Sequence, residues 1–192
     1  MPIPDYQSVM LPLLQFAEDR LEHSLRETID ALADVFALTP VERKQLLPSG
    51  QQEVFDNRVG WARTYLTKAG LLKKTRRGHY EISRAGLDAL AAKPSRVDVK
   101  FLERYEEFRE FRALRGTRSG AGTGAEPPDQ DQQTTPEEAL EFAYSRLRDS
   151  LASDIIQQVK AASPSLFERL VVELPLKMGY GGSRQDAGRA IG

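Results

Sequence analysis

Residues 54–82 constrain the fold more than any other part of the chain. Residues 71–74 and 79–82 have the pattern of two short strands, with a turn at residues 75–78 between them. Gly70 separates these strands from a preceding helical pattern, since glycine accepts the left-handed conformation that often ends a helix. In that pattern five apolar side chains recur at helical spacing and share one face: Phe55, Val59, Ala62, Leu66 and Ala69. The stretch predicts an amphipathic helix followed by a β-hairpin.

The same stretch is basic. Between residues 57 and 84 the chain carries eight lysines and arginines but a single acid, Glu81. The whole chain has a formal net charge of −1 and a pI near 6.2. Affinity for an anionic partner must therefore come from this local cluster rather than from the global charge, and such a cluster indicates a surface that faces phosphates.

Helix signals also precede and follow the basic stretch. The order of helices, long amphipathic helix and hairpin is that of a winged helix-turn-helix, and we expect residues 1–92 to form such a domain. The signals are the apolar spacing of residues 6–17 around Pro12, the cap Ser24 with Glu27 at capping-box spacing, Thr39 followed by Pro40, and Ser83 after the hairpin. We expect residues 48–50 to close the helix that begins at Pro40.

The expected core of this domain is small and stabilises it only modestly. It consists of Leu13, Leu14, Leu25, Ile29, Leu32, Phe36, Leu46, Phe55, Val59, Leu66, Leu72, Tyr80, Ile82 and Leu87.

The helical spacing also divides the polar side chains between base contacts and phosphate contacts. Gly60 shares the face opposite the apolar one with four residues that would meet the bases: Asn57, Trp61, Thr64 and Lys68. Six cations would meet phosphates: Arg58 and Arg63 beside that face, and Lys73, Lys74, Arg76 and Arg77 from the wing. The alternative is a protein-interaction domain in which Trp61 and Tyr65 are core or rim residues and the wing is unused.

The rest of the chain divides into three parts. Residues 93–115 form a charged amphipathic extension with aromatic side chains at helical spacing, which packs on the domain or on a second copy. Residues 116–135 are rich in Gly, Thr, Asp, Gln and Pro and are predicted to be a flexible linker. From residue 136 a long helix runs to about 162, and residues 163–165 separate it from a last apolar helix at residues 167–178. The overall class is mainly α, within α+β.

Composition excludes several kinds of protein. Cysteine is absent, which rules out disulfides and thiolate metal sites and fits a reducing compartment. No apolar run reaches the roughly 20 residues that span a bilayer, and no signal peptide is recognisable. His23 and His79 are too few and too far from acids to suggest a metal or acid–base site. We expect a soluble cytoplasmic protein without membrane contact.

Two separate segments resemble proteins of one family. Residues 56–63 (DNRVGWAR), with 47–50 (LPSG) before and 68–71 (KAGL) after, are similar to the N-terminal domain of the Mrr-type restriction endonucleases. Residues 166–173 (LFERLVVE) and 177–182 (KMGYGG) are similar to the first helix of that family's catalytic domain. The resemblance implies a DNA-binding winged helix, then the start of a PD-(D/E)xK nuclease domain at residues 136–192. In that family the complete enzyme cuts modified, typically methylated, DNA.

The resemblance does not supply a catalytic site. The family's metal-binding aspartate and its Gln-x-Lys pair follow the segment equivalent to residues 187–192, so they have no counterpart here. We therefore expect no catalytic or metal-binding residues, no cofactor and no enzyme in this chain as it stands; Mg²⁺ is expected for the complete family enzyme. Glu168 is the one candidate accessory carboxylate, and a solvated glutamate is the simpler interpretation. The D-x-K tripeptide at residues 98–100 precedes the linker and is attributed to chance.

The predicted function is a DNA-binding module of an Mrr-like restriction system, with double-stranded DNA as partner. A first alternative is the N-terminal fragment of an active type IV restriction endonuclease. A second is a non-catalytic dimerisation or protein-interaction module, which would use the aromatic stripe of residues 101–111 and the apolar face around Leu170.

Overall fold

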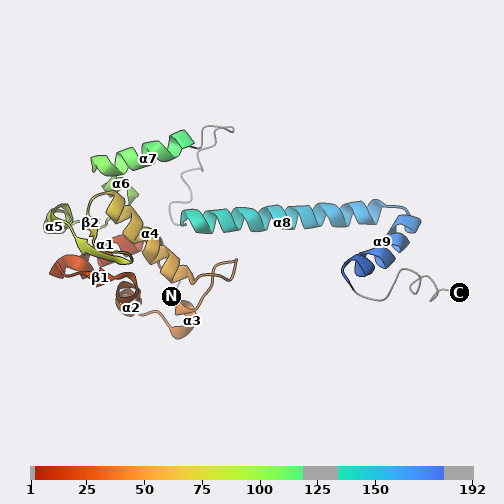
Figure 1. Cartoon of the computed structure of the whole chain (residues 1–192), viewed down its shortest axis with the longest axis horizontal. Helices are drawn as coiled ribbons and strands as arrows, with labels where there is room; N and C mark the ends of the chain where they lie inside the picture. The colour runs from red at the N-terminus through yellow and green to blue at the C-terminus, as the bar shows by residue number, and fades with distance from the viewer. Residues whose placement is uncertain (1–2, 119–133, 180–192) are drawn as a thin grey trace. The chain divides into compact units, whose positions relative to one another are not determined.

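The protein is mainly helical, with one small antiparallel sheet (Figure 1). The computed structural model describes residues 3–118 and 134–179, and the backbone alone for 115–118. Contacts divide the chain into two compact units, Met1–Phe142 and Ala143–Gly192. Most of the predicted linker, at residues 116–135, lies outside the described residues. In the first unit the elements are α1 (Tyr6–Phe16), η1 (Ala17–Asp19), β1 (His23–Ser24), α2 (Leu25–Val35), α3 (Pro40–Arg43), α4 (Val54–Lys68), β2 (Leu72–Lys74), β3 (His79–Ile82), α5 (Arg84–Ala91), α6 (Val99–Leu102) and α7 (Glu106–Arg118).

Side-chain caps explain where these helices begin. Ser24 and Glu27 form the predicted capping box at the start of α2, and Ser83 accepts the Gly86 amide at the start of α5. Thr39 caps α3 with Pro40 in the first helical position, but α3 ends at Arg43, well short of the predicted residues 48–50. A bridge between Leu46 and Glu53 follows instead, so the chain turns back toward α4.

The sheet has the strand order β1-β3-β2, and all its pairs are antiparallel. The β2–β3 hairpin has the expected position, with Leu72 opposite Ile82 and Lys74 opposite Tyr80. Strand β1 pairs its His23 with Tyr80 and was not expected, because two residues are too short to show an alternating pattern.

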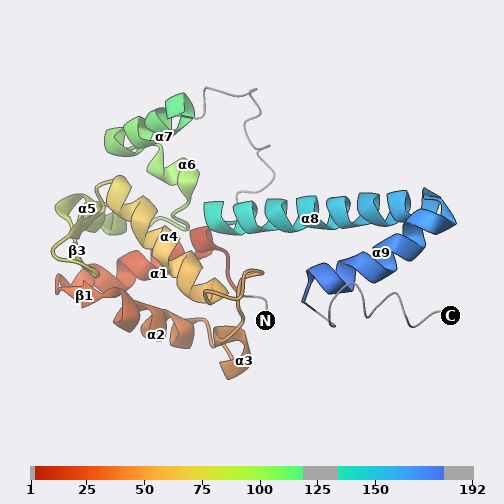
Figure 2. The ribbon, with the colours of Figure 1, turned by 45° about the vertical axis from the view of Figure 1, so that its right-hand side comes forward.

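Helix α4 lies at the centre of the first unit. It packs on α1 and α2 on one side and on α6 and α7 on the other, as Figures 1 and 2 both show. Of the predicted core, ten side chains are buried and Leu25, Phe36 and Leu87 are partly buried. Leu46 is 50% exposed, so the prediction that it belongs to the core was wrong. Its neighbour Leu47 is only 3% exposed, because Leu46 forms a β-bridge with Glu53 and adjacent side chains in an extended segment point to opposite sides.

Residues 97–111 complete this core. Val97, Leu102 and Phe108 are fully buried in the same apolar cluster as α1 and α4, and Tyr65 of α4 contacts the rings of Phe108 and Phe111. The amphipathic extension thus packs on its own domain, one of the two arrangements that the sequence allowed.

Two further helices follow residue 135. These are α8 (Pro136–Ala161) and α9 (Pro164–Lys177), separated at Ser163 as the sequence predicts, with Pro175 inside α9. Four large apolar side chains of α8 are exposed: Leu140, Leu147, Leu151 and Ile155. None of the helices formed by residues 3–118 and 134–179 is long and apolar enough to cross a membrane.

Candidate nucleic-acid interface

Helix α4 has one face in the core, and the sequence located that face correctly. Phe55, Val59, Ala62, Leu66 and Ala69 are all buried. The helix ends at Lys68, and Gly70 follows with φ +73°, the left-handed conformation expected there.

The spacing of Asn57 predicts an exposed position, but the structure buries this residue. It is only 2% exposed, because the beginning of α8 covers it. Its Oδ1 accepts a hydrogen bond of 2.6 Å from Thr135 Oγ1, and its Nδ2 donates to Glu137 Oε2 at 2.6 Å and to Gln52 Oε1 at 3.1 Å. Helical spacing alone could not show that a segment 78 residues further along the chain covers this position.

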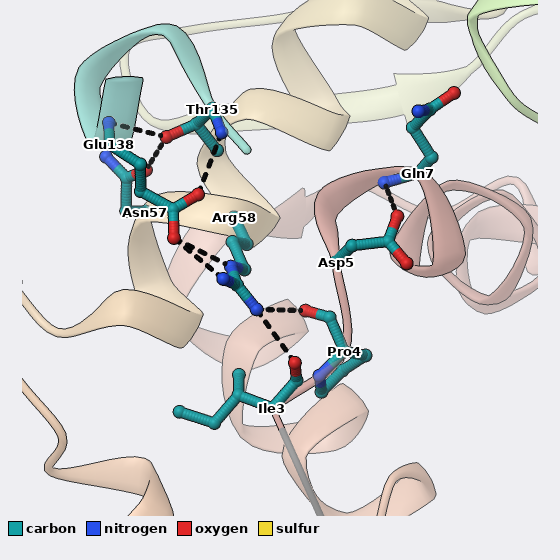
Figure 3. A network of polar contacts seen from close by, with 8 residues as sticks. All are labelled: Ile3, Pro4, Asp5, Gln7, Asn57, Arg58, Thr135 and Glu138. Atoms are coloured by element: carbon teal, nitrogen blue, oxygen red, sulfur yellow. Dashed lines mark hydrogen bonds and ion pairs between the residues drawn. The ribbon is translucent and has the colours of Figure 1, made fainter. Parts of the chain in front are cut away.

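Arg58 is held in the same place by an ion pair (Figure 3). Its Nε and Nη2 both donate to Glu138 Oε1, at 3.1 and 2.7 Å, and its Nη1 donates to the carbonyls of Ile3 and Pro4. The Arg58 side chain is 17% exposed and that of Glu138 only 3%. We call the contacts of Asn57 and Arg58 with Thr135, Glu137 and Glu138 the α4–α8 polar network.

A third glutamate of α8 extends the contact to the loop before α4. Glu141 accepts hydrogen bonds from the backbone amide and the hydroxyl of Ser49, at 2.9 and 2.7 Å. The first two turns of α8 thus direct three carboxylates toward α4 and its preceding loop.

Trp61 and Lys68, two of the predicted base-contacting residues, each contact a neighbouring aromatic side chain; Trp61 is half-buried and Lys68 is exposed. Trp61 packs against the core beside Tyr65, with ring centroids 5.9 Å apart. The Lys68 ammonium lies 5.2 Å from the centre of the Phe111 ring in α7, a cation–π contact.

An uncovered strip remains on α4 between the network and the hairpin. Gly60, Arg63, Thr64 and Thr67 are half-buried, and a Cβ on Gly60 would meet nothing within 4 Å. Thr64 and Thr67 hydrogen-bond through Oγ1 to the carbonyls four residues earlier, at 2.8 Å each. Thr67 was absent from our prediction, although its spacing of three from Thr64 and seven from Gly60 places it on the same strip.

The hairpin carries the remaining predicted cations, and all four are exposed: Lys73, Lys74, Arg76 and Arg77. Lys73 pairs with Glu81 at 3.3 Å and Arg76 with Glu22 at 2.8 Å. Hydrogen bonds from Thr75 and Arg76 hold the pKa of the Glu22 carboxyl below its usual value. Lys74 and Arg77 have no ion-pair partner among the residues that the structure describes.

The acidic candidates outside α4 have structural roles or are solvated. Asp98 caps α6 by accepting the Phe101 amide at 2.8 Å, which accounts for the first residue of the D-x-K tripeptide. Glu168 is exposed on α9. Within the described ranges, no cluster of three or more His, Asp and Glu side chains could hold a metal ion.

Comparison with known proteins gives two matches. The family model described as the Mrr N-terminal domain matches residues 6–92. The type IV methyl-directed restriction enzyme EcoKMrr of Escherichia coli (strain K12) is 30% identical over an alignment that covers all of this chain. This chain spans 64% of the length of that relative. No solved structure matches the chain.

Proposed function

Because the chain belongs to the Mrr-type restriction proteins and carries their N-terminal domain, we propose that its first unit binds duplex DNA. The fold of this unit supports a winged-helix mode of binding: α2 and α4 precede the β2–β3 hairpin, and β1 pairs with β3. In that mode α4 enters the major groove and the hairpin is the wing that follows the sugar-phosphate backbone.

The observation that carries the proposal is the position of the exposed cations on the hairpin that directly follows α4. Arg76 and Arg77 are at its tip, and Lys73 and Lys74 are on its first strand. The salt bridges of Lys73 with Glu81 and of Arg76 with Glu22 are exposed. Replacing either carboxylate by a DNA phosphate therefore costs little free energy. These four side chains, with Arg63 of α4, form the proposed phosphate contacts.

The uncovered strip of α4 forms the proposed base contacts. The hydroxyl protons of Thr64 and Thr67 are donated to the helix backbone, so each hydroxyl oxygen can accept a hydrogen bond from a base amino group, while each threonine methyl group suits a thymine methyl. Gly60 lets a groove wall approach the helix backbone. This assignment replaces part of the set derived from the sequence. Asn57 and Arg58 are occupied by α8, Trp61 packs against the core beside Tyr65, and the exposed Lys68 lies over the Phe111 ring of α7.

We further propose that the domain serves a methyl-directed restriction system acting in the cytoplasm. The support is the name of the relative, a type IV methyl-directed restriction enzyme, and the full coverage of this chain in the alignment. In such a system the module brings a Mg²⁺-dependent nuclease to modified DNA, and the nuclease activity belongs to the whole protein.

The experiment is a titration of the chain against methylated and unmethylated duplexes at several salt concentrations. With four or five phosphate contacts, log K should fall against log salt with a slope of roughly −4. A measurable preference for methylated duplex would support the restriction role as well. A slope near zero, or no binding at 50 mM salt, would contradict the proposal.

A second candidate function is self-association through α8. The exposed side chains of Leu140, Leu147, Leu151 and Ile155 favour it, because a helix seldom leaves such a row of large apolar side chains in water. Sedimentation of wild type and a Leu147→Asp/Leu151→Asp variant would test this. Dimers of wild type that dissociate in the variant are expected; a monomeric wild type would exclude it.

A further inference from the structure

The α4–α8 polar network uses the cap of one helix to hold another. Thr135 and Glu138 form a capping box: Thr135 Oγ1 accepts the Glu138 amide at 3.1 Å, and Glu138 Oε2 accepts the Thr135 amide at 2.8 Å. The same hydroxyl donates its proton to Asn57, and the other oxygen of the same carboxylate binds Arg58. The beginning of α8 is therefore folded and attached to α4 by the same two side chains.

The centre of the network, formed by Asn57, Thr135 and Glu138, is buried and its hydrogen bonds are complete. Thr135 is fully buried and Glu138 is 2% exposed, and no buried side-chain nitrogen or oxygen in the described ranges lacks a hydrogen-bond partner. Charged partners at this depth bind strongly only when every bond is made, so the contact has a defined closed form rather than a range of loose ones.

The network adjoins the surface that we propose for DNA. Asn57 precedes Gly60 by three residues and Thr64 by seven, which is about 5 and 10 Å along a helix axis. The Debye length is about 10 Å at 0.1 M salt, so a duplex whose bases contact Gly60 and Thr64 would bring its phosphates within range of the Glu137 carboxylate. In the closed form that carboxylate and that of Glu141 oppose the approach of DNA.

We propose that the beginning of α8 and duplex DNA compete for Asn57 and Arg58. In the closed form Glu138 neutralises Arg58 and Thr135 occupies Asn57. When DNA binds, α8 releases both side chains: Arg58 contacts a phosphate, and Asn57 reaches the groove. This inference rests on the proposed function, and it gives a role to two residues that the free protein keeps from DNA.

Competition is reciprocal. If closure of the network lowers the affinity for DNA by some factor, DNA must lower the stability of the closed network by the same factor. The inference therefore makes two predictions that use different measurements, one on the affinity and one on the beginning of α8.

The first measurement is hydrogen exchange of the wild-type chain with and without a duplex. The amides to follow are those of Thr135, Glu138 and Ala139, each of which donates within the first turn of α8. Saturating duplex should speed their exchange about tenfold or more, whereas the amides of α1 keep their rates. Unchanged or slower exchange with bound DNA would overturn the inference. No substitution is needed, so a folding defect cannot obscure the result.

The second measurement compares two triple variants with equal charge change. Glu137→Gln/Glu138→Gln/Glu141→Gln removes the carboxylates that face α4, while Asp149→Asn/Asp154→Asn/Glu168→Gln neutralises exposed acids further along α8 and on α9. The first variant should bind duplex about tenfold more tightly than wild type, and the control less than threefold. Equal affinities of the two variants would overturn the inference.

The outcomes separate the inference from the function on which it rests. If neither wild type nor the first variant binds duplex at low salt, the proposed function fails. If wild type binds with a salt-dependent affinity but both measurements show no competition, DNA binding stands and the network is a fixed attachment of α8 to α4.

Discussion

The beginning of α4 and the tip of the β2–β3 hairpin both carry arginines, yet they use them in opposite ways. Arg58 is held by a buried carboxylate and two carbonyls, whereas Arg77 projects from an exposed turn without an ion-pair partner in the described ranges. The two residues belong to one basic stretch of sequence. Position in the fold, rather than residue type or local charge, decides which cation holds the structure together and which is available to a phosphate.

The difference also separates stability from recognition. Removing one partner of a buried ion pair strongly destabilises the fold, because the other charge is left buried without a partner. An exposed cation contributes little to folding stability but much to the affinity for a polyanion. The comparison can therefore be tested by asking whether substitutions in the two regions affect different quantities.

The largest expected effect is that of Arg58→Ala on stability. The substitution leaves Glu138 buried without its partner and should lower the free energy of unfolding by about 3 kcal/mol. Urea unfolding followed by circular dichroism measures it. Arg77→Ala is the matched control and should change stability by less than about 0.5 kcal/mol. Equal effects of the two substitutions would remove the distinction between the regions.

The next largest effect is expected at Tyr80 of β3, which is buried although it pairs with Lys74 beside the exposed turn of the hairpin. Burial raises the pKa of Tyr80 to about 12, and its hydroxyl lies 2.5 Å from Thr28 Oγ1. Since folding favours the neutral phenol, this stability is complete below the unfolded pKa near 10 and is lost as pH rises to about 12, amounting to about 3 kcal/mol.

Urea unfolding between pH 9 and 12 would measure this loss. Tyr80→Phe should flatten the pH dependence of the free energy of unfolding, because it removes the titrating phenol. It should also lower the free energy of unfolding at neutral pH by about 1 kcal/mol, because the hydrogen bond with Thr28 is lost. An equal pH dependence in wild type and Tyr80→Phe would show that this tyrosine is not the responsible group.

The smallest effect is expected from Gly60→Ala, which should raise the stability of the protein but lower its affinity for DNA. Gly60→Ala should stabilise the protein by about 1 kcal/mol, because alanine favours a helix and its Cβ would meet nothing within 4 Å. The methyl group would stand where the DNA groove approaches, so affinity for duplex should fall about threefold to tenfold. If Gly60→Ala binds duplex as tightly as wild type, close approach at this strip is excluded.

Local signals predicted most of the elements. The caps Ser24, Thr39 and Ser83 each mark a helix start that the structure contains, and the apolar spacing of α4 identified its buried face. These features depend on residues within a few positions of one another, which is why a single sequence reveals them.

The candidate site was less predictable, because it depends on residues far apart in the chain. Asn57 and Lys68 are on the face opposite the core, as their spacing indicates, but α8 covers Asn57, while Lys68 stays exposed with its ammonium over the Phe111 ring of α7. The Thr-x-x-Glu pattern at Thr135 and Glu138 is a recognisable capping box. Nothing in that pattern reveals that it also binds Arg58, whose partner lies 80 residues away.

The central claim is that the hairpin, and not the beginning of α4 in its closed form, contacts phosphates. Its most direct test is the salt dependence of duplex binding by wild type, by Arg76→Ala/Arg77→Ala, and by the control Arg146→Ala/Arg148→Ala on α8. The hairpin variant should bind more weakly at every salt concentration, with a slope shallower by about 2, while the control matches wild type. Equal slopes in all three proteins would show that the hairpin does not contact phosphates.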